Sequence, residues 1–111
     1  VILHELSAET ADGDTESSSH DNAAQSTAGG AGYLQITAID LDGHTALEVD
    51  ILDSADDATF ASKAAFTAAT AVGAERIAIA GTIRRYTAVS YDFTGTGTSP
   101  SATFMTGIVR Y

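Results

Sequence analysis

Residues 82–93, TIRRYTAVSYDF, carry the clearest structural signal in the chain. Two arginines lead into a run that alternates between two kinds of side chain. One side of the run carries Thr87, Val89, Tyr91 and Phe93, and the other carries Tyr86, Ala88 and Ser90. A period of two indicates a β-strand with one buried face. We therefore predict a strand here, with Tyr86, Tyr91 and Phe93 filling or flanking a core.

Five more segments alternate in the same way and predict further strands. They are residues 1–6, 33–39, 45–52, 75–80 and 101–111. Between the second and the third of these stands Asp42-Gly43, a dipeptide typical of tight hairpin turns. We therefore predict that residues 33–39 and 45–52 pair as an antiparallel hairpin with one solvated face.

Residues 58–72 are ambiguous between helix and strand. Their alanines favour a helix, whereas Phe60, Phe66 and the threonines favour short strands. We predict a strand, because the flanking elements are strands and a β-sandwich rarely holds a long helix in its middle.

The strand pattern predicts the fold class and the domain organisation. About seven to eight short antiparallel strands are typical of an all-β sandwich of the jelly-roll or immunoglobulin-like type. A chain of 111 residues fits a single domain, residues 1–111, with a modest core. Residues 7–32 are rich in Ser, Thr, Asp, Gly and Ala without an apolar period, and we predict a long polar loop there.

Composition excludes several kinds of protein. The chain has no cysteine, which rules out disulfides, thiolate nucleophiles and cysteine-bound zinc. No apolar run reaches the roughly 18 residues that a membrane-spanning helix needs, so we expect no membrane insertion.

The charge of the chain is strongly and unevenly negative. Fifteen acids against five Lys and Arg give a net charge of −10, and every basic residue lies after position 60. Such a chain repels nucleic acids and anionic membranes, so we expect neither as a partner. The acidity fits either solubility or adaptation to high salt. The single lysine fits salt adaptation, but a GC-rich genome would also replace Lys with Arg.

The acidic stretch 12–21, DGDTESSSHD, is the one candidate metal site. Asp12, Asp14, Glu16 and Asp21 offer the hard oxygens that calcium prefers. The glycine and glutamate spacing of an EF-hand loop is missing, so we interpret the stretch as a solvated acidic loop. We predict no metal site and no cofactor.

No residue pattern predicts catalysis. His4, His20 and His44 are scattered without metal-ligand spacing, and we predict surface or edge positions for them. The glycine-rich residues 95–100, GTGTSP, lack the lysine and the helix of a phosphate loop and are interpreted as a turn. Glu48 and Asp50 fit one solvated strand face. We therefore predict that the protein is not an enzyme.

Arg84 and Arg85 are the residues from which we predict contacts. Adjacent residues on a strand point to opposite faces. We expect one of the two arginines to meet an acidic loop of the same domain and the other to reach a neighbouring subunit, because arginines are scarce in so acidic a chain.

Three parts of the sequence, taken in order, resemble a known family. They are VILHELSAETADGD (1–14), GGAGYLQITAIDLDGHTALEVDILDSADDATF (29–60), and AERIAIAGTIRRYTAVSYDF (74–93) followed by SATFMTGIVRY (101–111). This series resembles the C-terminal accessory β-sandwich domain of major tail, or tail tube, proteins of long-tailed phages and related viruses. The resemblance covers nearly the whole chain and lies in the order and spacing of the segments.

The resemblance implies a non-enzymatic virion structural protein, whose domain projects from the exterior of the tail tube and decorates or stabilises it. A tube-forming domain would precede Val1, so that the chain is part of, or processed from, a longer virion protein. The resemblance also implies self-association in symmetric rings or contact with neighbouring virion proteins. A capsid decoration protein of a tailed virus is the nearest alternative.

The central part is also similar to galactose-binding-like jelly rolls, including discoidin-type carbohydrate modules. The similarity lies in DSADDATF (53–60) and the strand that ends in RRYTAVSYD (84–92). In those modules the arginine–tyrosine strand is scaffold and not a sugar contact, and this chain lacks tryptophan and an obvious aromatic platform. A glycan-binding module, with weak contact to host-surface glycans, is therefore an alternative function.

Overall fold

The computed structural model describes residues 1–111 as nine β-strands and one turn of 3₁₀ helix, η1 (Glu16–Ser18). The strands are β1 (Ile2–Glu9), β2 (Gly13–Asp14), β3 (His20–Asp21), β4 (Gly30–Asp40), β5 (Ala46–Ser54), β6 (Ala61–Ala65), β7 (Gly73–Ile79), β8 (Tyr86–Thr94) and β9 (Ser101–Arg110). None of its helical structure has the length and apolar character needed to cross a membrane.

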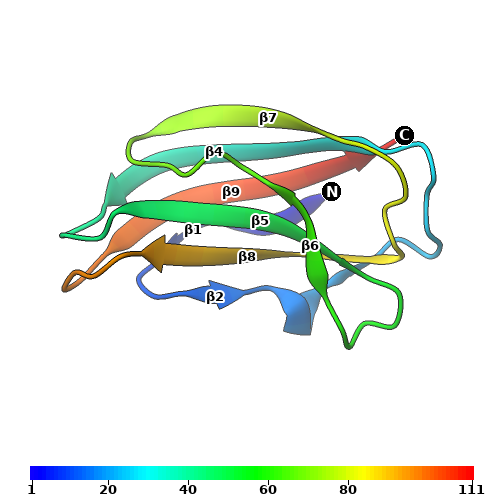
Figure 1. Cartoon of the computed structure of the whole chain (residues 1–111), viewed down its shortest axis with the longest axis horizontal. Helices are drawn as coiled ribbons and strands as arrows, with labels where there is room; N and C mark the ends of the chain where they lie inside the picture. Colours follow the sequence, from blue (N-terminus) through cyan, green and yellow to red (C-terminus); the bar gives the residue numbers. More distant parts are fainter.

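The strands form two antiparallel sheets that pack face to face (Figure 1). The first sheet has the order β1-β9-β4-β7. The second sheet has the order β2-β8-β5-β6, with the short β3 also paired to β8. Most connections cross from one sheet to the other, as in a jelly roll. The predicted all-β sandwich is thus confirmed, and its strand order is that of the jelly-roll type.

Residues 7–32 contain more regular structure than predicted. β1 continues to Glu9, β4 begins at Gly30, and both β2 and β3 pair with β8. The backbone N–H of Thr15 donates to the Val89 carbonyl, which extends the contact with β8. Because β2 and β3 are built from a few polar residues, they leave no apolar period in the sequence. They raise the strand count to nine, above the seven or eight predicted.

The predicted hairpin between residues 33–39 and 45–52 is wrong. The turn itself forms, because the Leu41 carbonyl accepts a hydrogen bond from the His44 N–H at 2.9 Å. Asp42 and Gly43 have positive φ angles of 44° and 99° there. Beyond the turn, however, β4 joins β9 and β7, whereas β5 joins β8 and β6. The two strands face each other across the core because each packs its apolar side against the opposite sheet.

Residues 58–72 contain no helix, which confirms the preference for a strand. β6 covers residues 61–65 and pairs with β5. Ala69 continues this contact through an isolated bridge to Leu47, and the Phe66 side chain between them is buried. Pairing with β5 therefore overrides the helix propensity of the alanines.

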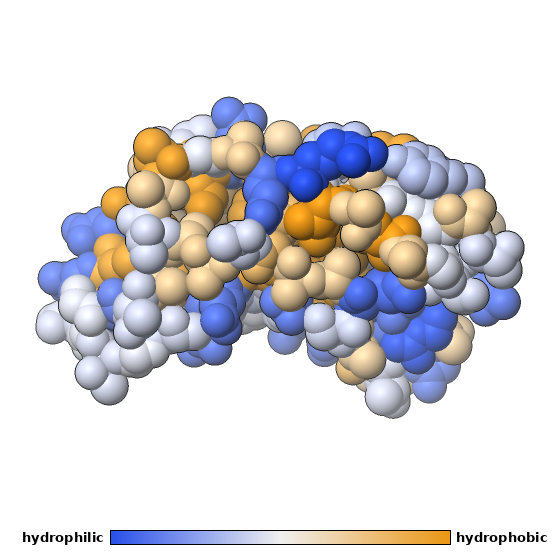
Figure 2. All heavy atoms as spheres, turned by 45° about the horizontal axis from the view of Figure 1, so that its top comes forward, coloured by the Kyte–Doolittle hydropathy of each residue, from blue (hydrophilic) through white to orange (hydrophobic).

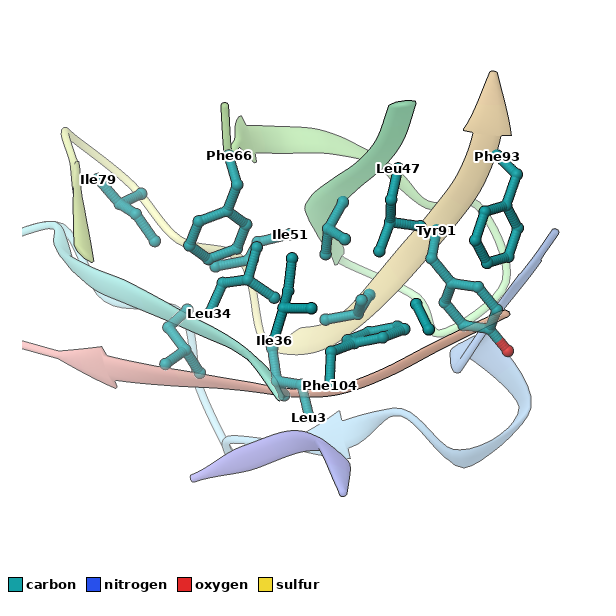
Figure 3. Packing of buried hydrophobic residues seen from close by; sticks show 14 of the residues in the cluster. Leu3, Leu34, Ile36, Leu47, Ile51, Phe66, Ile79, Tyr91, Phe93 and Phe104 are labelled. Carbon is teal, nitrogen blue, oxygen red and sulfur yellow. The ribbon is translucent and has the colours of Figure 1, made fainter. Parts of the chain in front are cut away.

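The core lies between the sheets and draws side chains from both (Figure 3). Phe104 and Ile108 enter it from the first sheet, and Leu47 and Ile51 enter it from the second. The predicted strand is confirmed, and its inward side carries four buried residues: Thr87, Val89, Tyr91 and Phe93.

Tyr86 lies outside this core. It sits on the outer side of β8, opposite Ser54 of β5, and is half-buried there. The guanidinium carbon of Arg85 lies 5.0 Å from the centre of its ring, which is a cation–π distance. Of the three aromatic residues predicted at the core, Tyr91 and Phe93 belong to it, and Tyr86 instead stacks with an arginine at the surface.

Candidate interaction surface

The acids of residues 12–21 hold the local backbone in place. Asp12 accepts a hydrogen bond from the Phe93 N–H at 2.7 Å, and Asp14 accepts one from the Glu16 N–H at 3.0 Å. Short loops between other elements are commonly closed by such aspartate contacts. No three His, Asp or Glu side chains form a group that could hold a metal ion. The stretch therefore fastens β2 and η1 to the edge of β8.

His4 lies on the edge strand β1, within the predicted surface or edge positions, but its side chain is buried. Its ring stacks on Phe104 with 4.1 Å between ring centres and 10° between planes. Its Nδ1 lies 3.1 Å from the Phe104 carbonyl oxygen, and its Nε2 lies 2.9 Å from the Glu9 carboxylate. These contacts fix β1 against β9. His20 on β3 and His44 in the β4–β5 turn are both partly buried.

Arg84 closes one end of the core against Asp53. Its Nε and Nη2 donate to Asp53 Oδ1 at 3.0 and 2.8 Å, and its backbone N–H donates to Oδ2 at 2.9 Å. Asp53 is only 4% exposed, so the carboxylate depends on these donors for its stability in the interior. Hydrogen bonding to Asp53 raises the pKa of the Arg84 guanidinium.

Arg85 pairs with Asp21 at the surface. Its Nε and Nη2 reach the two carboxylate oxygens at 2.7 and 2.8 Å, which is a bidentate contact. Hydrogen bonds from Arg85 and from the Ala23 N–H lower the pKa of Asp21 to about 2. Both adjacent arginines thus pair with carboxylates of their own chain. The predicted contact with an acidic loop of the same domain is therefore made by Arg85, and the contact with a neighbouring subunit stays a prediction.

Arg76 has no carboxylate partner. It lies on β7, where its Nε donates to the Tyr33 hydroxyl at 3.2 Å and its Nη2 donates to the Tyr111 hydroxyl at 2.8 Å. Its guanidinium carbon also lies 5.8 Å from the centre of the Tyr33 ring. The contacts with Tyr33 and Tyr111 raise the pKa of Arg76. Arg76 is therefore a permanent cation that two phenol groups hold in place.

The outer face of the first sheet surrounds Arg76 with uncharged residues. The register aligns β9, β4 and β7 in three adjacent rows. The rows are Val109–Ala31–Ala78, Gly107–Tyr33–Arg76 and Met105–Gln35–Ala74. None of these nine residues is acidic, and Tyr33 and Val109 are exposed. We call these nine residues, together with Tyr111, the arginine face.

The arginine face contains a hollow of about 400 Å³. Seven residues line it: Tyr33, Leu34, Gln35, Ala74, Glu75, Arg76 and Met105. The Glu75 carboxylate is held by Thr67, whose N–H and hydroxyl donate to it at 2.7 and 2.6 Å. Seen from the side on which β7 lies, the molecule shows strongly apolar side chains among hydrophilic ones (Figure 2), whereas the arginine face contributes only Val109 to the strongly apolar residues. An apolar depression with a few placed polar groups suits the binding of another molecule.

The outer face of the second sheet has the opposite character. The register places Glu48 directly opposite Asp92, and neither β5 nor β8 carries a basic residue. The one lysine of this sheet, Lys63, lies on the edge strand β6. A hydrogen bond with Asp12, burial, and repulsion from Asp12 and Glu48 raise the pKa of Asp92. We call the following residues the acidic face: Asp12, Asp14, Glu48, Asp50 and Asp92.

The arginine face was not predicted from the sequence. Tyr33 and Arg76 are 43 positions apart and meet through the register of β4 and β7. The guanidinium can donate to a carboxylate, and the tyrosine rings can pack against a flat partner. The useful signal in the sequence was the lack of any acid at positions 74, 76 and 78, on one side of the strand predicted at 75–80.

Comparison with known proteins does not identify the chain. No protein-family model matches its sequence, and no curated protein matches it. Its function must therefore be inferred from the two outer faces and from the order of its strand segments.

Proposed function

We propose that this chain is a non-enzymatic structural domain of a virion, which projects from the surface of a viral tail tube and decorates or stabilises the tail. The observation that carries the proposal is the contrast between the two outer faces. The arginine face has no acid among its residues, and the strands of the acidic face have no base. Such a domain can rest on a neighbour through one face while it presents the other to solvent.

The order of the strand segments supports the tail as the location. Residues 1–14, 29–60 and 74–111 resemble, in this order, the accessory domain of tail tube proteins. Jelly rolls occur in viral capsid proteins and also in lectins, and a fold alone does not specify a function. The proposed location therefore depends on the resemblance, and the proposed assembly role depends on the two faces.

In a tail, the mechanism of such a domain is assembly. Ring symmetry repeats each contact many times, so an interface can be small while the assembly as a whole is stable. The net charge of −10 keeps the outer surfaces of separate particles apart.

Immunogold labelling of purified virions tests the location. An antibody against this chain should decorate the tail along its length. Labelling of the head instead would support the capsid decoration protein. Particles that carry neither the label nor peptides of this chain in mass spectrometry would overturn the proposal of a virion protein.

A glycan-binding module is the second candidate function. The observation that favours it is the exposure of Tyr33 and Tyr111, by 42% and 62%, beside the donors of Arg76. Aromatic surfaces and hydrogen-bond donors together suit a sugar ring and its hydroxyls. A glycan array separates the two functions, because specific binding that is lost in Tyr33→Ala would favour the module over the scaffold.

A further inference from the structure

We infer that the arginine face docks a second copy of this chain, which enters with a carboxylate of its acidic face. The inference rests on the proposed function and deepens it, because it names the partner that the arginine face receives.

Arg76 has donors to spare. A guanidinium carries five N–H donors, and the hydrogen bonds to Tyr33 and Tyr111 use only one on each of two nitrogens. The two hydroxyls also hold the planar group in one orientation, so less conformational freedom remains to be lost on binding. Arg76 is therefore prepared to receive a carboxylate.

The chain contains a second arginine–tyrosine pair, and this one includes an acid. Arg85 lies 5.0 Å over the ring of Tyr86, as Arg76 lies 5.8 Å over the ring of Tyr33. Arg85 also holds both oxygens of Asp21, at 2.7 and 2.8 Å. In Arg76 the Nε and Nη2 donate instead to the Tyr33 and Tyr111 hydroxyls, so an incoming carboxylate would meet Nη1 and the remaining N–H of Nη2. The one carboxylate that lines the hollow, Glu75, already accepts hydrogen bonds from Thr67.

A second copy brings the missing acid. Its acidic face places Asp12 and Asp92 in contact, with Glu48 opposite Asp92, and neither β5 nor β8 supplies a base. An arginine from outside would form charge-assisted hydrogen bonds with this cluster and would offset its repulsion. Charge complementarity therefore favours another copy of this chain, because one contact satisfies both faces.

The contact is head-to-tail. The arginine face belongs to the first sheet and the acidic face to the second, so they lie on opposite outer sides of the sandwich. A copy that docks through one face keeps its other face free for a third copy. Contacts of this heterologous kind build rings when the rotation closes and filaments when it does not.

Sedimentation velocity of the 111-residue chain at low salt tests the inference. We expect self-association with a dissociation constant of about 0.1–1 mM, which is typical of a weak contact. Arg76→Ala should weaken the association at least about tenfold, because it removes the donors of the ion pair. Thr98→Glu changes the net charge by the same amount in the exposed β8–β9 turn, and it should leave the association unchanged.

A mixing experiment tests the direction of the contact. Arg76→Glu breaks the arginine face and keeps the acidic face, and Asp92→Arg does the reverse. Each variant alone should be monomeric where the wild type associates, whereas an equimolar mixture should associate again. If two arginine faces met each other instead, Asp92→Arg alone would associate like the wild type, and the inference would be overturned.

Other outcomes also decide the matter. A wild-type chain that stays monomeric at about 1 mM overturns the inference, and so do equal losses in Arg76→Ala and Thr98→Glu. Glycan binding at Tyr33 without self-association assigns the face to the glycan module. Arg76, Asp92 and Thr98 are all exposed, and circular dichroism verifies that each variant is folded. Tail labelling is independent of these results, so the inference and the proposed location can fail separately.

Discussion

Two tyrosine–arginine pairs lie on opposite sheets with similar geometry and different surroundings. Arg85 lies over Tyr86 and is neutralised by Asp21, whereas Arg76 lies over Tyr33 and meets no carboxylate. Where the chain supplies an acid, the arginine of such a pair closes the fold. Where the chain supplies none, the pair remains available to a partner.

The acids divide in the same way. Asp21 and Asp56 have hydrogen-bond donors, and their pKa values are lowered to about 2. Asp92 has Asp12 and Glu48 as neighbours, and its pKa is raised. Aspartates therefore stabilise the loops where they accept hydrogen bonds, and they destabilise the acidic face where they repel one another.

The largest expected effect is a loss of stability on removing Arg84, which binds a buried carboxylate, compared with removing Arg76 of the arginine face. Arg84→Ala leaves the Asp53 carboxylate buried without its main partner and should lower the free energy of unfolding by about 2–3 kcal/mol. The loss stays below that of a fully buried pair because the Arg84 side chain is 36% exposed. Urea unfolding of Arg84→Ala and of the control Arg76→Ala measures the difference. Equal destabilisation by both would make Arg76 a structural residue and break the comparison.

Low pH should destabilise the protein because it protonates Asp21 and Asp56, whose carboxylates accept hydrogen bonds in the folded chain. The pKa values of Asp21 and Asp56 are about 2 in the folded chain against an ordinary value of 3.8, so the unfolded chain binds these protons first. Their contribution is complete above pH 3.8 and is lost as the pH falls from 3.8 through about 2. Urea unfolding at a series of acidic pH values should show this loss, and Asp56→Asn should reduce it. Identical profiles for the variant and the wild type would contradict the assignment.

Asp92→Asn should stabilise the protein, because the pKa of Asp92 is shifted in the opposite direction to those of Asp21 and Asp56. Because the pKa of Asp92 is raised, the folded chain holds this proton more tightly, and stability falls as the pH rises from 3.8 through the raised value. At neutral pH the amide removes one charge beside Asp12 and Glu48, and we expect a gain of about 0.5 kcal/mol, or about 2–4 °C in Tm. The gain should disappear below pH 3.8, where the carboxyl group is protonated. A lower Tm at neutral pH would show that Asp92 is a stabilising residue.

Salt should have the smallest effect, and it should act through the acidic face. Raising the salt concentration from about 0.01 to about 1 M shortens the screening length from about 30 to about 3 Å. The Tm of the wild type should therefore rise, and it should rise less in Asp92→Asn, while Arg76→Ala should follow the wild type. A Tm that does not change with salt concentration would show that charge repulsion does not destabilise this surface, and it would contradict salt adaptation.

Alternation along the sequence predicted the strands and their buried sides well. The buried residues of β9 follow a strict period of two, and those of β8 do so apart from Ala88, which is buried on the outward side. Burial between two sheets selects the same face throughout a strand. The pairing of strands was less predictable. Asp42-Gly43 specifies a tight reversal, but the sheet that each flanking strand joins depends on strands far away in the sequence, such as β8 and β9.

The candidate site was hardest to predict because it is built from register. Arg84 and Arg85 attract attention as neighbours in the sequence, and the structure places a carboxylate on each of them. Arg76 has no other arginine or lysine near it in the sequence. It meets Tyr33 only through the pairing of β4 with β7, which no local pattern specifies. The burial of His4 was missed for a similar reason, since its stacking partner Phe104 lies 100 positions away.

If the arginine face of one copy meets the acidic face of the next, amide NMR of the isotope-labelled chain should detect both faces at once. Spectra recorded at increasing concentration, up to about 1 mM, report where copies touch. We predict shifts at Tyr33, Arg76 and Gly107 on one face and at Glu48 and Asp92 on the other, with Tyr86 unmoved. Shifts confined to one face, or spectra that do not change with concentration, would contradict the account.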